Sequence, residues 1–357
     1  MAVINPADLT FNGQEVREFA ECIFEELYAN PVLDQNHLIV EDIVAKQQIA
    51  IFGHLSKITK KDPGCGLGKV TKNIPMSEKF WNPVQLKIWL SECHNQFDAT
   101  FMVYYKKKGK EYPDLTVTEI FSQWLVEEVS QAAAEDILRI VYFSDTAAKK
   151  IADGGVFSAS VDLTDYDHLN GFFKQAFAIV AANSKQRVTI AKNAGASYAA
   201  QTFDDNDTTN RVATKILQNL IWNADIRFRN DPNFEILATR SLADQYAKER
   251  LNNDKLETVY HREESGIESI MVLGKKVFIY DIWDRTIQAD QDNGTKWNLP
   301  HRALAVSKNN MQIGFDEDQA YGDFDVFYDK MTETSNIKGG YKADAVIVED
   351  FRLMFAY

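Results

Sequence analysis

The sequence predicts an α+β fold, in which helices and strands follow one another irregularly and do not alternate as regular βαβ units. Its 357 residues are enough for two compact lobes with a substantial core. Hydrophobic residues make up 45% and charged residues 25%, ordinary values that exclude a wholly disordered chain. One segment has helical apolar spacing over about 25 residues, whereas several others alternate as strands do. This irregular mixture favours the α+β class.

The longest predicted helix runs from Thr116 to Val141. Thr116, followed three residues later by Glu119, has the pattern of a capping box. Apolar side chains recur at helical spacing, at Val117, Ile120, Phe121, Trp124, Leu125, Val129, Ala132, Ala133, Ile137 and Ile140. About 25 residues at 1.5 Å each make a rod of roughly 37 Å, about twice the average helix. Because the segment carries no convergent acid–base or metal-binding residues, we interpret it as a mechanical beam.

The segments before this helix are predicted from apolar spacing and turn residues. They are a helix at 12–29, strands at 37–44 and 48–52, an extended Gly-, Lys- and Pro-rich loop at 59–76, a helix from Asn82, and a strand at 101–105. The helix from Asn82 is predicted because Asn is a good N-cap and Pro83 suits the first helical position. Its predicted core face consists of Leu86, Trp89, Leu90, Cys93 and Phe97.

The segments after the long helix begin with a turn at 153–155. Predicted helices follow at 166–182, 207–227 and 241–251, and predicted strands at 187–191, 234–239, 275–282, 303–306, 311–315 and 345–357. Asp207 or Thr208 would cap the second of these helices. The last segment alternates to the end of the sequence, so we expect that end to be docked on the fold.

The net charge is −13, which argues against sequence-specific reading of DNA, because such proteins are usually basic. No run of eighteen apolar residues is present, so no membrane span is predicted, and the first residues lack a secretory signal pattern. The three cysteines are widely spaced and odd in number. They predict free thiols in a reducing compartment and do not suggest a disulfide framework.

The charge is unevenly distributed, with lysines gathered at 54–79 and 106–110 and acidic residues at 204–207 and 316–325. Such runs usually form solvated loops. The sharper interpretation is that basic loops of one copy contact acidic surfaces of another. The candidate intersubunit contacts are Lys57, Lys60, Lys61, Lys69, Lys72, Lys106, Lys107, Lys108, Asp204, Asp205, Asp316 and Asp318.

Motifs for nucleotide or metal binding fail on their spacing. Gly64–Lys69 lacks the four residues that a phosphate-binding loop needs between its first Gly and Gly-Lys, and Val70 replaces the required Ser or Thr. The acidic run 204–209 lacks the central Gly and the final Glu of a calcium loop. Cys93-His94 has no second pair at zinc spacing. We therefore predict no cofactor, no metal ligand and no catalytic residue.

One nucleophile motif is weak but present. Gly195-Ala-Ser-Tyr-Ala199 resembles a nucleophile elbow centred on Ser197. Its acid could be Asp225 or Asp244 and its base His261 or His301. Such partners are abundant in any acidic chain, so an ordinary turn is the favoured interpretation.

Five stretches carry a resemblance that spans nearly the whole chain. They are the opening AVINPADLTFNGQEV, Ser77–Val84, Gly171–Asn183, Tyr198–Leu217 and Leu299–Gly314. In these stretches and in the order of its elements, the chain resembles the major capsid protein of tailed bacteriophages, in particular the branch from phages and prophages of Bacteroides-like bacteria. The same fold is shared with encapsulins.

The resemblance implies a structural protein, without enzymatic activity, that is built in four parts. They are an N-terminal arm with the first strands at 1–46, an extended loop at 47–80, a peripheral domain at 81–162 plus 322–357 with its spine helix at 116–141, and an axial domain at 163–321. Copies would assemble as pentamers and hexamers into an icosahedral virion shell around phage DNA. Assembly would take place in the bacterial host cytoplasm.

The resemblance also implies the partners. They would be other copies of the chain, a portal, packaged DNA contacted non-specifically, and no membrane. Because the arm-like segment begins near Met1, we expect the scaffold to be a separate protein. Two alternatives remain open at this point. One is an encapsulin-like nanocompartment shell, and the other is a serine hydrolase that uses Ser197.

Overall fold

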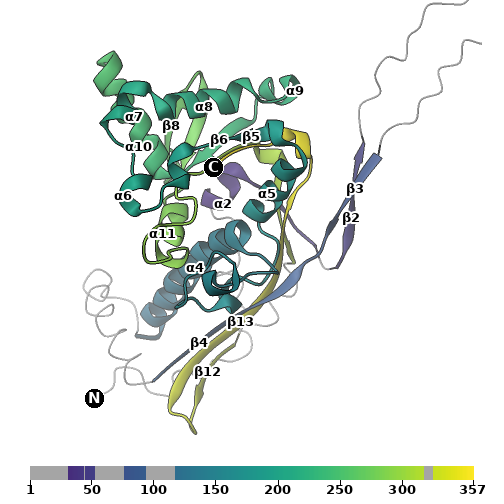
Figure 1. Ribbon diagram of the computed structural model, residues 1–357. Helices are drawn as coiled ribbons and strands as arrows, with labels where there is room; N and C mark the ends of the chain where they lie inside the picture. The colour runs from purple at the N-terminus through teal and green to yellow at the C-terminus, as the bar shows by residue number, and fades with distance from the viewer. Residues whose placement is uncertain (1–30, 44, 53–75, 94–116, 317–324) are drawn as a thin grey trace, which may run out of the picture.

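The computed structural model describes residues 31–43, 45–52, 76–93, 117–316 and 325–357, which form two β-sheets, a two-stranded ribbon and covering helices (Figure 1). The strands are β1 (Leu38–Val40), β2 (Gln47–Phe52), β3 (Met76–Trp81), β4 (Val84–Cys93), β5 (Arg187–Val188), β6 (Phe234–Ala238), β7 (His261–Arg262), β8 (Glu268–Val272), β9 (Lys275–Ile279), β10 (Ala303–Ser307), β11 (Met311–Asp316), β12 (Asp325–Asp329), β13 (Thr334–Ile347) and β14 (Met354–Ala356). The main helices are α2 (Pro31–Asn36), α4 (Val117–Phe143), α5 (Phe172–Ala182), α6 (Tyr198–Gln201), α7 (Asp205–Asn210), α8 (Val212–Trp222), α9 (Ile226–Arg229), α10 (Arg240–Glu249) and α11 (Asp281–Asp290).

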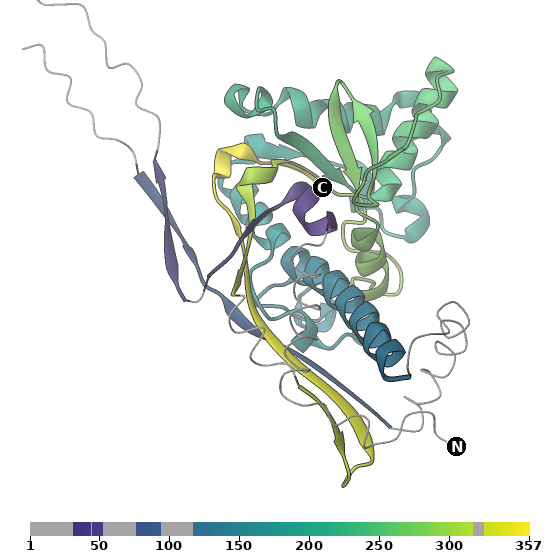
Figure 2. The same ribbon diagram turned by 180° about the vertical axis from the view of Figure 1, so that it is seen from behind.

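The five-stranded sheet is organised around β13. Strands β11 and β12 pair antiparallel with β13, and β4 pairs antiparallel with it from Val84 opposite Ala343 to Cys93 opposite Thr334. The short β1 adds to β11 in parallel. The 14 residues of β13 extend about 46 Å, and the 27 residues of α4 about 40 Å. Helix and strand run in similar directions through the lower part of the molecule (Figures 1 and 2).

The seven-stranded sheet has the order β5-β14-β10-β6-β9-β8-β7 and is buried on both faces in its centre. Side chains alternate along each strand, so neighbouring residues enter different cores. Leu237, Leu304 and Phe355 point into the core that contains α4, α5 and α11. Ile236, Ala305 and Met354 point into a second core with α8 and α10. The upper lobe is therefore a sheet between two helical layers.

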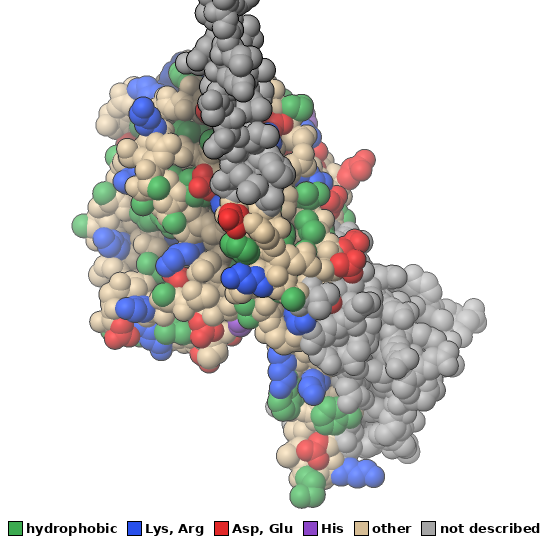
Figure 3. Space-filling view, turned by 90° about the vertical axis from the view of Figure 1, so that its right-hand side faces the viewer, with side chains coloured by type: hydrophobic (Ala, Val, Ile, Leu, Met, Phe, Trp, Pro, Cys, Tyr) green, Lys and Arg blue, Asp and Glu red, His purple; other side chains and the backbone are tan. Residues whose placement is uncertain are grey.

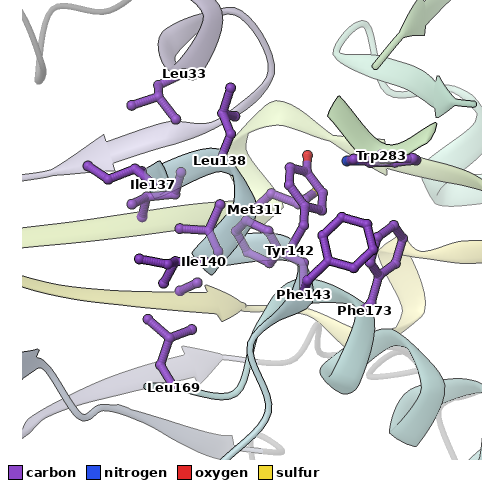
Figure 4. Packing of buried hydrophobic residues seen from close by; sticks show 14 of the residues in the cluster. Leu33, Ile137, Leu138, Ile140, Tyr142, Phe143, Leu169, Phe173, Trp283 and Met311 are labelled. Atoms are coloured by element: carbon purple, nitrogen blue, oxygen red, sulfur yellow. The ribbon is translucent and has the colours of Figure 1, made fainter. Parts of the chain in front are cut away.

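The main core forms where the end of α4 meets both sheets. Figure 4 shows residues from α4, α5, α11, β11 and α2 converging there, including Leu33, Ile137, Ile140, Phe143 and Met311. The ring of Trp283 lies 4.9 Å from that of Tyr142 and 4.8 Å from that of Phe173, both edge to face. Such aromatic pairs add about 0.5–1.5 kcal/mol each beyond the burial of their area. This cluster joins the two sheets into one body.

The ribbon of β2 and β3 leaves the body at a buried tryptophan. The two strands pair antiparallel from Gln47 opposite Trp81 to Phe52 opposite Met76. Trp81 is 4% exposed and packs with Ile43 and Val346 in a small core of its own. The rest of the ribbon projects from the body (Figure 2). A single aromatic anchor thus holds the base of the projection.

The long helix predicted at 116–141 is confirmed as α4, which begins at Val117 and ends at Phe143. Thr116 of the predicted capping box lies outside the described residues. Ala132 is exposed, whereas Ala134 and Leu138 are buried. The buried surface of the helix is therefore wider on one side than the predicted stripe.

The helix predicted from Asn82 is wrong, because this segment is strand β4. Leu86 is buried, but Trp89 is 57% exposed and Leu90 is 47% exposed. The Asn-Pro signal is local, and the ten-residue pairing with β13 overrides it. Trp89 is consequently a surface residue and not part of a helix core.

The helix predicted at 207–227 is divided into α7, α8 and α9. Arg211 has a left-handed backbone, with φ of 56°, and this residue separates α7 from α8. Asp204, and not Asp207 or Thr208, is the N-cap of α7. The predicted helix at 166–182 likewise begins only at Phe172, after Gly171.

The strand predicted at 345–357 is two strands in different sheets. β13 ends at Ile347, a short turn follows at Asp350–Arg352, and β14 pairs with β10 and β5 in the seven-stranded sheet. Conversely, β11 lies inside the predicted axial range 163–321 but pairs in the five-stranded sheet. The two sheets therefore do not divide the chain at residue 321. The predicted strand at 275–282 ends at Ile279, and α11 follows it.

The remaining strands predicted at 234–239, 303–306 and 311–315 are confirmed as β6, β10 and β11. The predictions at 37–44 and 48–52 correspond to the shorter β1 and to β2. The helix at 12–29, the loop residues 59–75 and the strand at 101–105 lie outside the described residues.

Candidate assembly surfaces

The structure describes three of the twelve candidate contact residues, namely Asp204, Asp205 and Asp316. The other nine lie outside the described part of the chain, and they are Lys57, Lys60, Lys61, Lys69, Lys72, Lys106, Lys107, Lys108 and Asp318. The candidate contact between basic loops and acidic surfaces can therefore be examined only from its acidic side.

The acidic turn at the start of α7 is held by a lysine of the same chain. Asp204 accepts the backbone N–H of Asp207, and the Asp207 carboxylate accepts the N–H of Asp204, which completes a capping box. Lys192 Nζ lies 3.0 Å from Asp204 and 2.8 Å from Asp207. The N–H of Asp207 and then Lys192 lower the pKa of the Asp204 carboxyl. Asp205 is exposed, so it is the carboxylate of this turn that is most available to a partner.

Asp316 does not lie on an acidic surface. Its side chain is 4% exposed and lies 3.1 Å from Lys342 Nζ, across the pairing of β11 with β13. A buried carboxylate that is already paired gains little from a second cation, because its desolvation has been offset by the first. The sequence placed Asp316 with its acidic neighbours because strand pairing is not visible in local composition.

Ser197 is a helix cap and not an activated nucleophile. Its hydroxyl accepts the N–H of Ala200 at the start of α6. The ring of His301 is occupied by Ser241 Oγ at 2.7 Å and by the carbonyl oxygen of Gln201 at 2.8 Å. The remaining candidates are also engaged elsewhere, since Asp225 pairs with Arg227 and Asp244 accepts from Tyr260, while His261 is exposed on β7. These contacts do not assemble a triad.

A groove of about 470 Å³ runs beside the base of the ribbon, between β3 and α5. Lys79 of β3 donates to the carbonyl oxygen of Ile347 and lies 2.6 Å from Asp350, which fixes the ribbon to the body. Phe80 next to it is 45% exposed, and Lys46 Nζ lies 4.8 Å from the centre of its ring. Burial raises the pKa of the Asp344 carboxyl on the groove wall. This surface is concave and partly apolar, beside a projection.

The seven-stranded lobe carries most of the exposed apolar surface. Eight of the 14 large hydrophobic side chains that are exposed in the described residues lie between 222 and 273, and they are Trp222, Ile226, Leu251, Leu256, Val259, Tyr260, Met271 and Leu273. Scattered apolar residues on a surface are ordinary, but such a concentration marks interaction sites. The sequence did not single these residues out, and their number on one lobe became visible only once the sheet and helices were in place.

A second exposed apolar region lies at the narrow lower end formed by β4, β12 and β13. Trp89 and Met331 are 57% and 93% exposed, and Lys87 Nζ lies 3.8 Å from the centre of the Trp89 ring. Hydrophobic side chains stand beside lysine and arginine at this end (Figure 3). The ends of the molecule are thus more apolar than a solvated surface requires.

Among the described residues, no group of three or more His, Cys, Asp or Glu side chains is arranged to hold a metal ion. Within the same part of the chain, no helix combines the length and the apolar character that crossing a bilayer requires.

The sequence matches no family model and no curated protein. Among solved structures, the chain is similar to one in the satellite phage P4 procapsid including the size determination protein, with a TM-score of 0.53 and 8% identity over 94% of this chain and 97% of that chain. It is also similar to a chain of Mycobacterium phage Adephagia, with a TM-score of 0.48 and 11% identity over 92% and 89%. A third similarity is to the holo-SrpI encapsulin complex from Synechococcus elongatus PCC 7942, with a TM-score of 0.46 and 9% identity over 92% and 87%.

The likeness to the procapsid chain spans almost the whole length of both chains. It shows that this protein has an α+β fold of the kind found in phage capsids, and it confirms the fold class predicted from the sequence.

Proposed function

We propose that this protein is a structural shell subunit, the major capsid protein of a tailed phage. The observation that carries the proposal is the fold, which matches a procapsid chain over 94% of this chain and 97% of the other. In this function the protein is not an enzyme and needs no cofactor. The assignment to the Bacteroides-type branch stays a prediction from the five stretches of sequence.

The architecture supports a mechanical role. A shell tile must resist bending, and here a helix of about 40 Å packs near a strand of about 46 Å. The core between them joins both sheets, so a force applied to one lobe is transmitted to the other. A projecting ribbon and exposed apolar surfaces at several ends of the molecule suit a subunit that touches several neighbours.

The finer features of the proposal follow the family resemblance. Copies would form pentamers and hexamers on an icosahedral lattice that encloses DNA, with a separate scaffolding protein and a portal. The lysines at 57–72 and 106–108 are proposed as the basic side of contacts between copies, with Asp205 on the acidic side. A net charge of −13 would keep non-specific contacts with packaged DNA weak, so that DNA could slide during filling and ejection.

Electron microscopy of the purified full chain, alone and with the scaffolding protein, tests the proposal. We expect rings, tubes or closed shells. A strict monomer at high concentration under both conditions would contradict it. Shells that enclose a co-purifying protein in place of nucleic acid would point to a nanocompartment of the same fold.

A further inference from the structure

Helix α8 has an exposed apolar patch at each end. The first, here called the Trp222 patch, consists of Trp222, Ile226 and Arg229 at the end of α8 and on α9. The second, called the Leu256 patch, consists of Leu251, Leu256 and the acidic Asp205, around the turn that follows α10. Figures 1 and 2 both show α9 and this turn at opposite ends of the upper lobe. The 11 residues of α8 separate the patches by about 16 Å.

The Trp222 patch is exposed although its helix is well anchored. Phe228, on the other face of α9, is fully buried, whereas Trp222 is 50% and Ile226 is 73% exposed. Arg227 is already engaged, because it pairs with Asp225 and stacks on Phe351. Arg229 is exposed, so this end presents a cation beside two large apolar side chains.

The Leu256 patch is also held in place by contacts beneath it. The side chain of Asn253 donates to the carbonyl oxygen of Thr208 at 2.7 Å, and Arg211 pairs with Asp254, so the turn and α7 move as a unit. Leu251 is 51% and Leu256 is 52% exposed. Lys248 and Lys255 lie on neighbouring turns. The acidic contribution therefore comes from the first turn of α7, where Asp205 is exposed.

The two patches complement each other in character. Both are apolar, one carries an exposed arginine, and the other carries an exposed aspartate. Because they face away from each other at opposite ends of one rigid helix, a copy cannot cover its own patches. A second copy can cover one, and it then presents the other to a third copy, which is a head-to-tail contact. Repetition of such a contact with a fixed rotation closes a ring.

We propose that the Trp222 patch of one copy docks on the Leu256 patch of the next, and that this contact builds the rings of the shell. The inference rests on the proposed shell function and names the partner surfaces within it. Trp222 is the anchor, since tryptophan dominates interface energies when it is covered. Arg229 and Asp205 steer the orientation, because opposite charges guide encounter and disfavour the reversed pairing.

Two single substitutions each disable one patch of the full chain. Ile226→Lys blocks the Trp222 patch and Leu256→Lys blocks the Leu256 patch, and both sites are exposed, so folding should be unaffected. Asn219→Lys is the matched control, since it adds the same charge at an exposed position on α8 between the patches. Circular dichroism melting verifies that all three variants fold. Mass photometry and sedimentation velocity then measure the assembled species.

We expect the wild type and Asn219→Lys to form rings or larger species. Each patch variant alone should stay monomeric, with its self-association weakened about 30-fold or more. Mixed one to one, the two variants should give dimers and no rings, because the mixture contains one intact pair of faces. A charge swap, Arg229→Asp with Asp205→Arg in one chain, should assemble better than either single reversal.

Dimers of Leu256→Lys alone would show that the Trp222 patch pairs with itself, and this would overturn the head-to-tail contact. Wild-type assembly by both patch variants would overturn the inference while leaving the shell function intact. A wild type that never assembles would remove the shell function, and the inference with it.

Discussion

The indole ring of Trp81 lies directly against the backbone of Gly314. A Cβ placed on Gly314 would come within 3.0 Å and 3.1 Å of the Trp81 ring carbons Cζ3 and Cε3, and within 2.9 Å of Cγ1 of Ile43. Trp81 ends β3 and Gly314 lies in β11. The ribbon is therefore seated on the five-stranded sheet at a position that leaves no room for a side chain.

We expect Gly314→Ala to lower the free energy of unfolding by about 1–3 kcal/mol, because the added methyl group must displace a packed ring or a strand. Chemical denaturation measures the effect. In a Trp81→Phe background the smaller ring should relieve the clash, so that the same substitution costs less. Equal losses in both backgrounds would show that the contact with Trp81 is not the cause.

A buried histidine makes stability depend on pH. Nδ1 of His37 lies 2.8 Å from the carbonyl oxygen of Leu33, so Nδ1 carries the proton, and Nε2 accepts from the Tyr142 hydroxyl at 2.7 Å. Burial lowers the pKa of His37 from 6.5 to about 4. The folded protein therefore resists protonation that the unfolded chain accepts. Its contribution to stability is complete above pH 6.5 and is lost as the pH falls towards 4.

His37→Gln removes this dependence. The stability difference between pH 7 and pH 4 should be smaller in the variant than in the wild type, by up to about 3 kcal/mol. Burial raises the pKa of Asp284 to about 6, and this acts in the opposite direction, so the comparison must be made between the two proteins. His261→Gln, at an exposed position on β7, is the control. An unchanged pH profile in His37→Gln would contradict the assignment.

Trp283 offers a test of core packing. The side chain is fully buried among aromatic rings, and its indole N–H meets no hydrogen-bond acceptor among the described residues. Trp283→Ala should cost about 3–5 kcal/mol of unfolding free energy through the cavity that it leaves. Trp283→Phe should cost less than about 1.5 kcal/mol, because the smaller ring keeps most contacts and removes the unsatisfied N–H. Similar losses in both variants, measured by urea unfolding, would contradict this account.

The predictable elements of the fold are those whose signals are local. The long helix α4 follows from apolar spacing between Val117 and Ile140, and strands such as β6 and β10 follow from short apolar runs. The failures occur where distant residues decide. Asn82 and Pro83 resemble a helix start, but ten residues of β13, more than 240 positions away, pair with the segment as a strand.

The surfaces were less predictable than the fold. Acidic composition correctly drew attention to Asp205, yet it also selected Asp316, which strand pairing buries beside Lys342. Ile226 and Leu256 gave no signal, because a sequence does not state which apolar residue the folded core leaves outside. Exposure is a tertiary property, and it can be assigned only when the neighbouring helices have been placed.

Glu249 explains why the helix predicted at 207–227 is interrupted. Its buried carboxylate, at the end of α10, accepts the backbone N–H groups of Ala213 and Thr214, each at 2.8 Å, and the Thr214 hydroxyl at 2.8 Å. It thus caps the start of α8 from another helix, where the N–H groups and the helix dipole favour a negative charge. Arg211 can then turn into its left-handed conformation without leaving these donors unpaired.

We expect Glu249→Gln to lower the free energy of unfolding by about 1–3 kcal/mol, because one of the two amide N–H groups would face an NH₂ group in place of an acceptor. The loss should be nearly independent of salt, since the carboxylate is 1% exposed and therefore poorly screened. Glu257→Gln, at an exposed position beyond the same helix, should change stability by less than about 0.5 kcal/mol. Urea unfolding at low and high salt measures both variants. If Glu249→Gln were as mild as Glu257→Gln, or if its effect vanished in salt, the carboxylate would not be the cap that permits the break at Arg211.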